Sequence, residues 1–156
     1  MKKSLLARNN DLANTQRQLE ILSNGIFADG ELPTFAKKIK ETNQFPLRPK
    51  KLEILQINLG YMCNQVCAHC HVDAGPDRKE IMTIETMQQC LEVIKKTGAH
   101  TLDLTGGAPE MNPNFRWLVE EASKAGLTDL IVRSNVTIIC ANKTYHDVPA
   151  FFTKHN

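Results

Sequence analysis

The sequence predicts an α/β fold built around a parallel β-sheet. Three short apolar stretches, 52–59, 101–105 and 129–133, have the composition of buried strands. A segment with helical periodicity follows each of them along the chain. Helices between successive strands are the crossovers that connect parallel strands, so we expect one sheet made of βα units.

The first 50 residues are expected to be an extension outside this sheet. Leucines recur among polar residues over 4–24, which predicts an amphipathic helix ending near Gly25. Residues 29–50 hold three prolines and mixed charges, and we expect a surface linker there. The chain therefore divides into a helix and linker at 1–50 and a core domain at 51–156.

The first βα unit begins with the strand 52–59, which we expect to be buried. Thr83 is placed to cap the amino end of the following helix, with Glu85 in its first turn. Gly98 suits the C′ position that ends this helix. Four apolar residues form one face of the helix: Ile84, Met87, Leu91 and Ile94.

The second and third units repeat the pattern. We expect Asn112 to cap a helix whose first residue is Pro113 and which ends before Gly126. A third helix is expected near the end of the sequence. The inward-facing residues are expected to be Phe115, Leu118, Val119, Ala122 and Ala125 in the second helix, and the third helix contains Tyr145, Val148, Phe151 and Phe152.

Composition and charge narrow the class of protein. The chain has 156 residues, 42% of them hydrophobic and 23% charged, which is ordinary for one globular domain. A formal net charge of +2 does not favour nucleic acid or an anionic membrane as a partner. The sequence shows neither a secretory segment nor an apolar run of membrane-spanning length. We therefore expect a cytoplasmic protein, in which cysteines more often serve metals or catalysis than disulfides.

The segment 63–71, CNQVCAHCH, fits several kinds of metal or cofactor site. Its C-x-x-C-H portion matches the spacing for covalent haem, although that attachment takes place outside the cytoplasm. Cys63, Cys67, Cys70 and His71 also offer four zinc ligands, but the adjacent Cys70 and His71 are awkward for one small ion. Three thiolates in one loop are equally able to hold an iron–sulfur cluster with one iron left open.

The remaining cysteines are expected to be small buried hydrophobes. Cys90 lies in the apolar part of a predicted helix, and Cys140 follows an apolar run. Only the three cysteines of the loop are therefore candidate ligands.

Polar or glycine-rich segments follow all three predicted strands. The cysteines come after the first strand, the pair Gly106 and Gly107 after the second, and Ser134 and Asn135 after the third. Ligands of parallel α/β folds bind at the carboxyl ends of the strands. The sequence therefore predicts that the three segments form one ligand-binding site at the carboxyl edge of the sheet.

The spacing Cys63-x-x-x-Cys67-x-x-Cys70 after the first strand of a βα series resembles the radical S-adenosylmethionine (radical SAM) superfamily. The resemblance implies a partial TIM-like barrel in which the three thiolates hold a [4Fe-4S] cluster. It also implies that the open iron binds S-adenosylmethionine, whose carbon–sulfur bond is broken by one electron to release a 5′-deoxyadenosyl radical. A small-molecule substrate and an electron donor such as flavodoxin or ferredoxin are implied as partners.

The same resemblance assigns cofactor contacts by position. His69 matches a residue whose backbone lies near the adenine, and Gly106 and Gly107 match the turn that holds the methionine end. Ser134 and Asn135 match a polar strand end that contacts the ribose or carboxylate. The superfamily pattern continues with Glu after the glycines, whereas this chain continues Ala-Pro-Glu, which makes Glu110 a candidate contact to the amino group.

Two longer segments resemble the arsenosugar-biosynthesis radical SAM family. They are CHVDAGP at 70–76 and TGGAPE at 105–110, within a similarity that runs over 52–138. The resemblance implies transfer of an adenosyl group to a methylated trivalent arsenical. Members of that family are about twice as long, so we expect a truncated barrel. The alternative is a shortened, non-catalytic module that binds a cluster or zinc.

Overall fold

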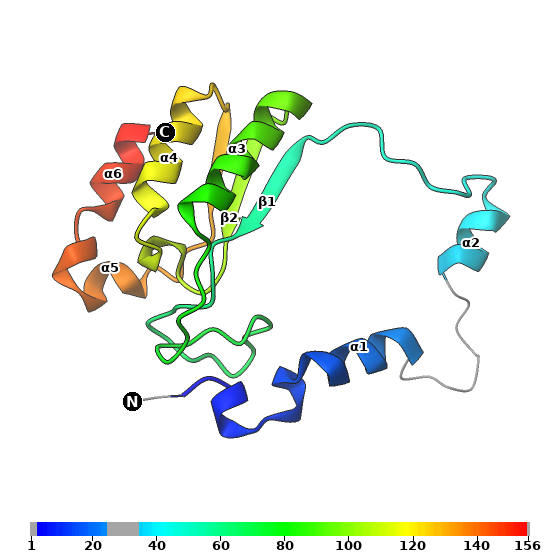
Figure 1. Cartoon of the computed structure of the whole chain (residues 1–156), viewed down its shortest axis with the longest axis horizontal. Helices are drawn as coiled ribbons and strands as arrows, with labels where there is room; N and C mark the ends of the chain where they lie inside the picture. Colours follow the sequence, from blue (N-terminus) through cyan, green and yellow to red (C-terminus); the bar gives the residue numbers. More distant parts are fainter. Residues whose placement is uncertain (1–2, 25–34, 156) are drawn as a thin grey trace.

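The sheet has three parallel strands in the order β1, β2, β3, which confirms the predicted α/β class and strand direction (Figure 1). The computed structural model describes residues 3–24 and 35–155. Short 3₁₀ turns lie at Leu6–Arg8, Asp11–Ala13, Pro109–Met111 and Lys143–Tyr145. The strands and α-helices are α1 (Thr15–Asn24), α2 (Phe35–Glu41), β1 (Ile54–Asn58), α3 (Ile84–Thr97), β2 (Thr101–Thr105), α4 (Phe115–Lys124), β3 (Asp129–Val132), α5 (Thr137–Ala141) and α6 (Val148–His155).

The two faces of the sheet differ in chemistry because side chains alternate along each strand. Leu102 and Leu104 of β2 lie on the apolar face, which packs against α3 and α4 in one core. On the opposite face Gln56 of β1 is level with Asp103 of β2, and Asn58 is level with Thr105. The carboxyl ends of the strands therefore border a polar surface.

The helix α3 begins and ends as the sequence predicts. The Thr83 side chain accepts a hydrogen bond from the Thr86 amide at 3.3 Å. Gly98 ends the helix with φ +70°, and its amide donates to the carbonyl of Ile94. Met87, Leu91 and Ile94 are buried against the sheet, and the fourth predicted residue, Ile84, is half-buried.

The second helix starts later than predicted. Asn114, not Asn112, precedes the first helical residue, Phe115. Asn112 is buried, and its side-chain oxygen accepts the Asn114 amide at 2.9 Å, as a helix cap does. Its side-chain nitrogen also donates to the carbonyls of Leu59 and Met82, each at 3.0 Å, which ties the strand-to-helix connections together. At the other end Ala125 is exposed because it lies beyond the last helical turn, so its inward placement is also wrong.

The N-terminal extension also differs from the prediction. Helix α1 starts only at Thr15, since Asn9 has φ +53° and the chain before it is bound through its amides to aspartates far along the sequence. The expected linker contains α2, whose Ala, Lys and Glu residues favour helix. Residues 29–34 of that linker lie outside the described residues.

Two further expectations of burial are wrong. The strand 52–59 was expected to be buried, but β1 is an edge strand and its Ile54 is 52% exposed on the face opposite α3 and α4. Cys140 is exposed because it lies in α5, a short helix that the sequence pattern did not indicate. Cys90 is half-buried and packs against the main core.

The third predicted helix is present as α6. Val148 is buried, and the rings of Phe151 and Phe152 pack around Phe115 of α4 with centroids 6.3 and 6.1 Å away. Tyr145 lies before this helix, in a 3₁₀ turn. None of the helices within 3–24 and 35–155 is both long and apolar enough to cross a membrane.

Candidate functional site

The cysteine loop, which we define as residues 60–81, connects β1 to α3 and closes on itself through backbone pairing. The Tyr61 amide donates to the carbonyl of Glu80 at 2.9 Å, and the Cys63 amide donates to that of Gly75 at 3.2 Å. In return the Gly75 amide donates to the carbonyl of Tyr61 at 3.0 Å. These bonds hold the two arms of the loop side by side, and the loop lies below the sheet in Figure 1.

The three thiols occupy different environments within this loop. Cys63 is buried, with 6% of its surface exposed, whereas Cys67 and Cys70 are half-buried. Backbone amides donate to two of the sulfurs: Gln65 to Cys63 Sγ at 3.4 Å and Ala74 to Cys70 Sγ at 3.3 Å. Such N–H···S bonds are among the contacts that tune iron–sulfur clusters.

Burial raises the pKa of the Cys63 thiol, because the thiolate loses solvation. Hydrogen bonds from Gln65 and Asn135 act in the opposite direction, and repulsion from Cys67 and Cys70 raises the pKa further. Binding a cationic metal centre would relieve this repulsion.

The three thiols of the loop form a donor set that fits an iron–sulfur cluster. Within the ranges 3–24 and 35–155 no three His, Cys, Asp or Glu side chains converge as ligands of one metal ion. A [4Fe-4S] cluster binds each thiolate through a different iron, so its ligands do not need to meet at one point. Three thiols on a backbone-paired loop, two of them already accepting amide hydrogen bonds, provide that arrangement.

The predicted glycine turn after β2 lies directly against the cysteine loop. Gly106 has φ +145°, and the Gly107 and Ala108 amides donate to the carbonyls of Gly60 and Met62, each at 2.9 Å. A Cβ atom at Gly107 would lie 2.4 Å from the Met62 carbonyl oxygen. The close approach that requires glycine at 107 is therefore to the loop that carries the cysteines.

The other residues that were predicted to contact the cofactor differ in how they are placed relative to the cysteine loop. The Asn135 side-chain amide donates to Cys63 Sγ at 3.5 Å and to Asn64 Oδ1 at 2.9 Å, so the end of β3 reaches the cysteine loop. The Ser134 hydroxyl accepts from the Val136 amide within its own turn, at 3.0 Å. His69 lies exposed in the cysteine loop.

Arg133, which the sequence pattern did not single out, lies near the cysteine loop with His71, which was named above only as a candidate zinc ligand. Together with Gln56, Asn58 and Thr105 they line a cavity of about 400 Å³ at the polar face of the sheet. Reading the alternation of β1 as a two-faced strand would have identified Gln56 and Asn58. The cavity reaches the cysteine loop at His71 and Val72.

A three-residue network holds Arg133 at this cavity. Its guanidinium donates from Nε and Nη2 to both oxygens of Asp103, each at 2.8 Å, and the Gln56 amide donates to Asp103 Oδ2 at 2.6 Å. Arg133 consequently holds the pKa of Asp103 below its ordinary value. The carboxylate therefore stays charged at neutral pH and fixes the cation at the cavity wall.

Glu110 is a further polar group near the glycine turn. It is 5% exposed, and neither carboxylate oxygen has a hydrogen-bond partner within the described ranges. Unpaired buried carboxylates are costly, so this one is suited to a cationic or hydrogen-bond-donating ligand.

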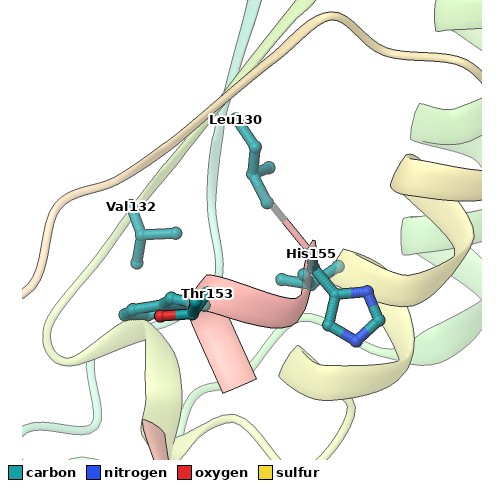
Figure 2. Close-up of a pocket in the computed structure, with 6 residues that line it drawn as sticks. Leu130, Val132, Thr153 and His155 are labelled. Atoms are coloured by element: carbon teal, nitrogen blue, oxygen red, sulfur yellow. The ribbon is translucent and has the colours of Figure 1, made fainter. Parts of the chain in front are cut away.

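A second cavity lies on the helix side of the sheet and has different chemistry. It measures about 340 Å³ and is lined by β3, α4 and α6. Figure 2 shows Leu130 and Val132 of β3 directed toward Thr153 and His155 of α6. Its lining contains none of the cysteines, and four of its six residues are apolar, so we assign it to packing rather than to chemistry.

Comparison with known proteins points to the radical SAM superfamily, which the cysteine spacing of the loop also resembles. No family model matches this chain. A probable GTP 3′,8-cyclase of Saccharolobus islandicus is 28% identical over 86 residues, which are 55% of this chain and 28% of the relative. A GTP 3′,8-cyclase of Peptoclostridium acidaminophilum is 28% identical over 90 residues, again 55% of this chain and 28% of the relative.

A third relative has a different substrate class. The antilisterial bacteriocin subtilosin biosynthesis protein AlbA of Bacillus subtilis is 25% identical over 83 residues, 53% of this chain and 18% of that protein. Each of these matches spans less than a third of the relative's own length. These relatives are members of the radical SAM family. The chain is therefore similar, over about half of its length, to enzymes of the radical SAM superfamily.

Proposed function

We propose that this chain is a radical SAM protein whose Cys63, Cys67 and Cys70 hold a [4Fe-4S] cluster. The observation that carries the proposal is the position of these thiols. They lie on one backbone-paired loop at the carboxyl end of β1, where parallel α/β folds bind ligands. The similarity to radical SAM enzymes supports the same assignment.

The chain's own residues would fix the thiols and the cofactor. The backbone amides of Gln65 and Ala74 donate hydrogen bonds to the sulfurs of Cys63 and Cys70. The glycine turn holds the arm of the loop that follows β1, through hydrogen bonds to its carbonyls. When bound, the cluster and S-adenosylmethionine supply a 5′-deoxyadenosyl radical, after one electron from a donor such as flavodoxin or ferredoxin.

Several residues are proposed to bind S-adenosylmethionine. Asn135 and the Gly106–Gly107 turn border the cysteine loop. His69 and Ser134 are proposed contacts because of their positions in the sequence pattern. Glu110 is the best candidate partner for the amino group, because its carboxylate is buried and lacks a partner within the described ranges. An ammonium group would supply both the charge and the hydrogen bonds that it lacks.

The polar cavity beside the loop is the proposed place for a small-molecule substrate. Its lining offers amides, a hydroxyl and the cation of Arg133. By the resemblance of CHVDAGP and TGGAPE, we propose a methylated arsenical and adenosyl transfer. The relatives named above are GTP cyclases and a bacteriocin biosynthesis protein, so this substrate rests on the two sequence segments alone.

Anaerobic reconstitution tests the assignment of the cluster. We expect about four irons and four sulfides per chain, with loss of both when Cys63, Cys67 or Cys70 is replaced by Ala. Cys90→Ala and Cys140→Ala are the matched controls and should retain full iron. Stoichiometric zinc without sulfide would contradict the proposal and favour a metal-binding module that is not catalytic.

A further inference from the structure

The N-terminal residues Ser4–Leu6 are bound to the outgoing arm of the cysteine loop, which is the part that leads toward α3. About seventy positions separate the two segments in sequence. Figure 1 shows this blue segment running beneath the loop. Ser4 is 1% exposed, and it donates from its amide to Asp77 Oδ1 and from its hydroxyl to Asp77 Oδ2, each at 3.0 Å. The burial of Ser4 and its two hydrogen bonds make this contact a specific part of the fold.

Asp73 is the centre of the contact. Its carboxylate, 8% exposed as a residue, accepts the Leu5 amide at Oδ1 and the Leu6 amide at Oδ2. On its other side Arg78 donates from Nη1 to Oδ2 at 2.8 Å and to the Asp73 carbonyl at 2.8 Å. One carboxylate therefore joins the N-terminal segment to both ends of the turn 73–78.

Asp73 is also coupled to a cysteine ligand through the backbone. Its amide donates to the Cys70 carbonyl at 3.3 Å, and the next amide, that of Ala74, donates to Cys70 Sγ at 3.3 Å. Asp73 itself has φ +51°, a left-handed conformation that is unfavourable for a residue with a Cβ. The bonds to its carboxylate compensate for this conformation and so hold the Ala74 amide toward the sulfur.

The packing around the turn leaves little freedom. A Cβ atom at Gly75 would lie 2.8 Å from Asp77 Oδ1 and 3.4 Å from the Ser4 Cβ. Arg78 lies over the Tyr61 ring with its guanidinium carbon 4.7 Å from the centroid, which ties the outgoing arm to the incoming one. Movement of the N-terminal segment would therefore be transmitted to both arms.

We propose that Ser4–Leu6 form a clasp on the cysteine loop, and that Asp73 is the positioning residue through which the clasp orients Cys70. The orientation of Cys70 is a property of the metal-free chain. Only the consequence for a bound cluster rests on the proposed function. Asp73 contacts no cofactor in this account and acts through the Ala74 amide.

The first test measures the reactivity of Cys70 in the metal-free protein. In a background with Cys63, Cys67, Cys90 and Cys140 replaced by Ser, the rate of labelling by an aromatic disulfide reports how firmly the loop is closed. Asp73→Asn removes the ion pair with Arg78 and weakens two amide contacts, so labelling should accelerate about tenfold. Asp77→Asn should accelerate it less, because its contacts lie farther from Cys70.

Asp147→Asn is the matched control, since Asp147 also pairs with an arginine, Arg116 of α4, at 2.7 Å, but it lies just before α6, away from the loop. Its labelling rate should equal that of the parent. Circular dichroism confirms that each variant is folded. If Asp73→Asn is unfolded, Asp77→Asn and Ser4→Ala carry the test, and parent-like labelling in both overturns the clasp.

The second test uses the wild-type cysteines and measures the reduction potential of the reconstituted cluster. Asp73→Asn should shift this potential relative to the parent and to Asp147→Asn, because the N–H···S bond to Cys70 is altered. If no cluster forms in the parent, the proposed function fails while the labelling result still decides the clasp. Equal labelling rates for Asp73→Asn and Asp147→Asn, with a cluster present in both, overturn the clasp alone.

Discussion

Gly107 and the Met62 carbonyl are packed so closely that a methyl group at 107 would lie 2.4 Å from the oxygen. The turn after β2 therefore packs directly against the cysteine loop. The Ala108 amide donates to the same carbonyl at 2.9 Å, which sets the position of the chain one residue before Cys63. The geometry of the first thiol thus depends on a residue in a different βα unit.

Gly107→Ala should displace the entering arm of the loop and reduce iron binding. Forcing a methyl group against backbone typically destabilises a fold by about 1–3 kcal/mol. Iron per chain and the thermal unfolding midpoint measure the two effects. Gly98→Ala is the control: it strains a residue at φ +70° but meets no atom within 4 Å, so it should lower stability without lowering iron content.

Asn135→Ala should raise the pKa of Cys63 further. The thiol is already shifted upward by burial, and the Asn135 amide is one of the contacts that oppose the shift. In metal-free protein with Cys63 as the only cysteine, the midpoint of alkylation rate against pH should move to higher pH. Asn142→Ala, in an exposed turn elsewhere, should leave it unchanged. A lower midpoint for Asn135→Ala would contradict this account of the site.

Asp103→Asn should destabilise the fold at neutral pH but not in strong acid. Arg133 lowers the pKa of Asp103, so the carboxylate stabilises the folded state above its ordinary pKa of 3.8. This stabilisation is lost as the pH falls through the lower folded-state value. Urea unfolding at pH 7 should show a loss of roughly 1–2 kcal/mol, and the difference from wild type should shrink below pH 3. A difference that grows in acid would rule out the proposed ion pair.

Ile131→Lys should reduce self-association of this chain. Strand β3 pairs only with β2 among the described strands, so its other side presents backbone groups able to pair with another chain. A lysine at the 37%-exposed Ile131 places a charge at that edge. Sedimentation velocity should show less dimer or aggregate than for wild type. Val93→Lys, at a 40%-exposed position on α3, is the matched control and should have no effect.

Much of the fold follows from local sequence pattern. Short apolar stretches and helical periodicity predicted the three strands and the helices α3, α4 and α6 in their order along the chain, and Thr83 and Gly98 predicted both ends of α3. These signals are local because capping depends on residues within one turn. The late start of α1 was not predictable in this way, since it depends on contacts of Leu5 and Leu6 with Asp73.

The sequence predicted which segments lie at the carboxyl ends of the strands better than it predicted the contacts between them. The cysteine spacing identified the loop, and the parallel sheet placed the glycine turn beside it. The burial of Cys63 and the contact from Asn135 depend on packing between three connections distant in sequence. Asn112 shows the same limit, because the pattern predicted the hydrogen bond of its side-chain oxygen to the Asn114 amide but not the two buried carbonyls that its side-chain nitrogen bridges.

The measurement that tests the central claim most directly is the electron paramagnetic resonance spectrum of the reduced, reconstituted protein with and without S-adenosylmethionine. A cluster held by Cys63, Cys67 and Cys70 alone has one iron without a protein ligand, where the cofactor can bind. We predict that saturating S-adenosylmethionine changes the spectrum, and that Gly107→Val weakens the change. An identical spectrum with and without the cofactor would contradict the account.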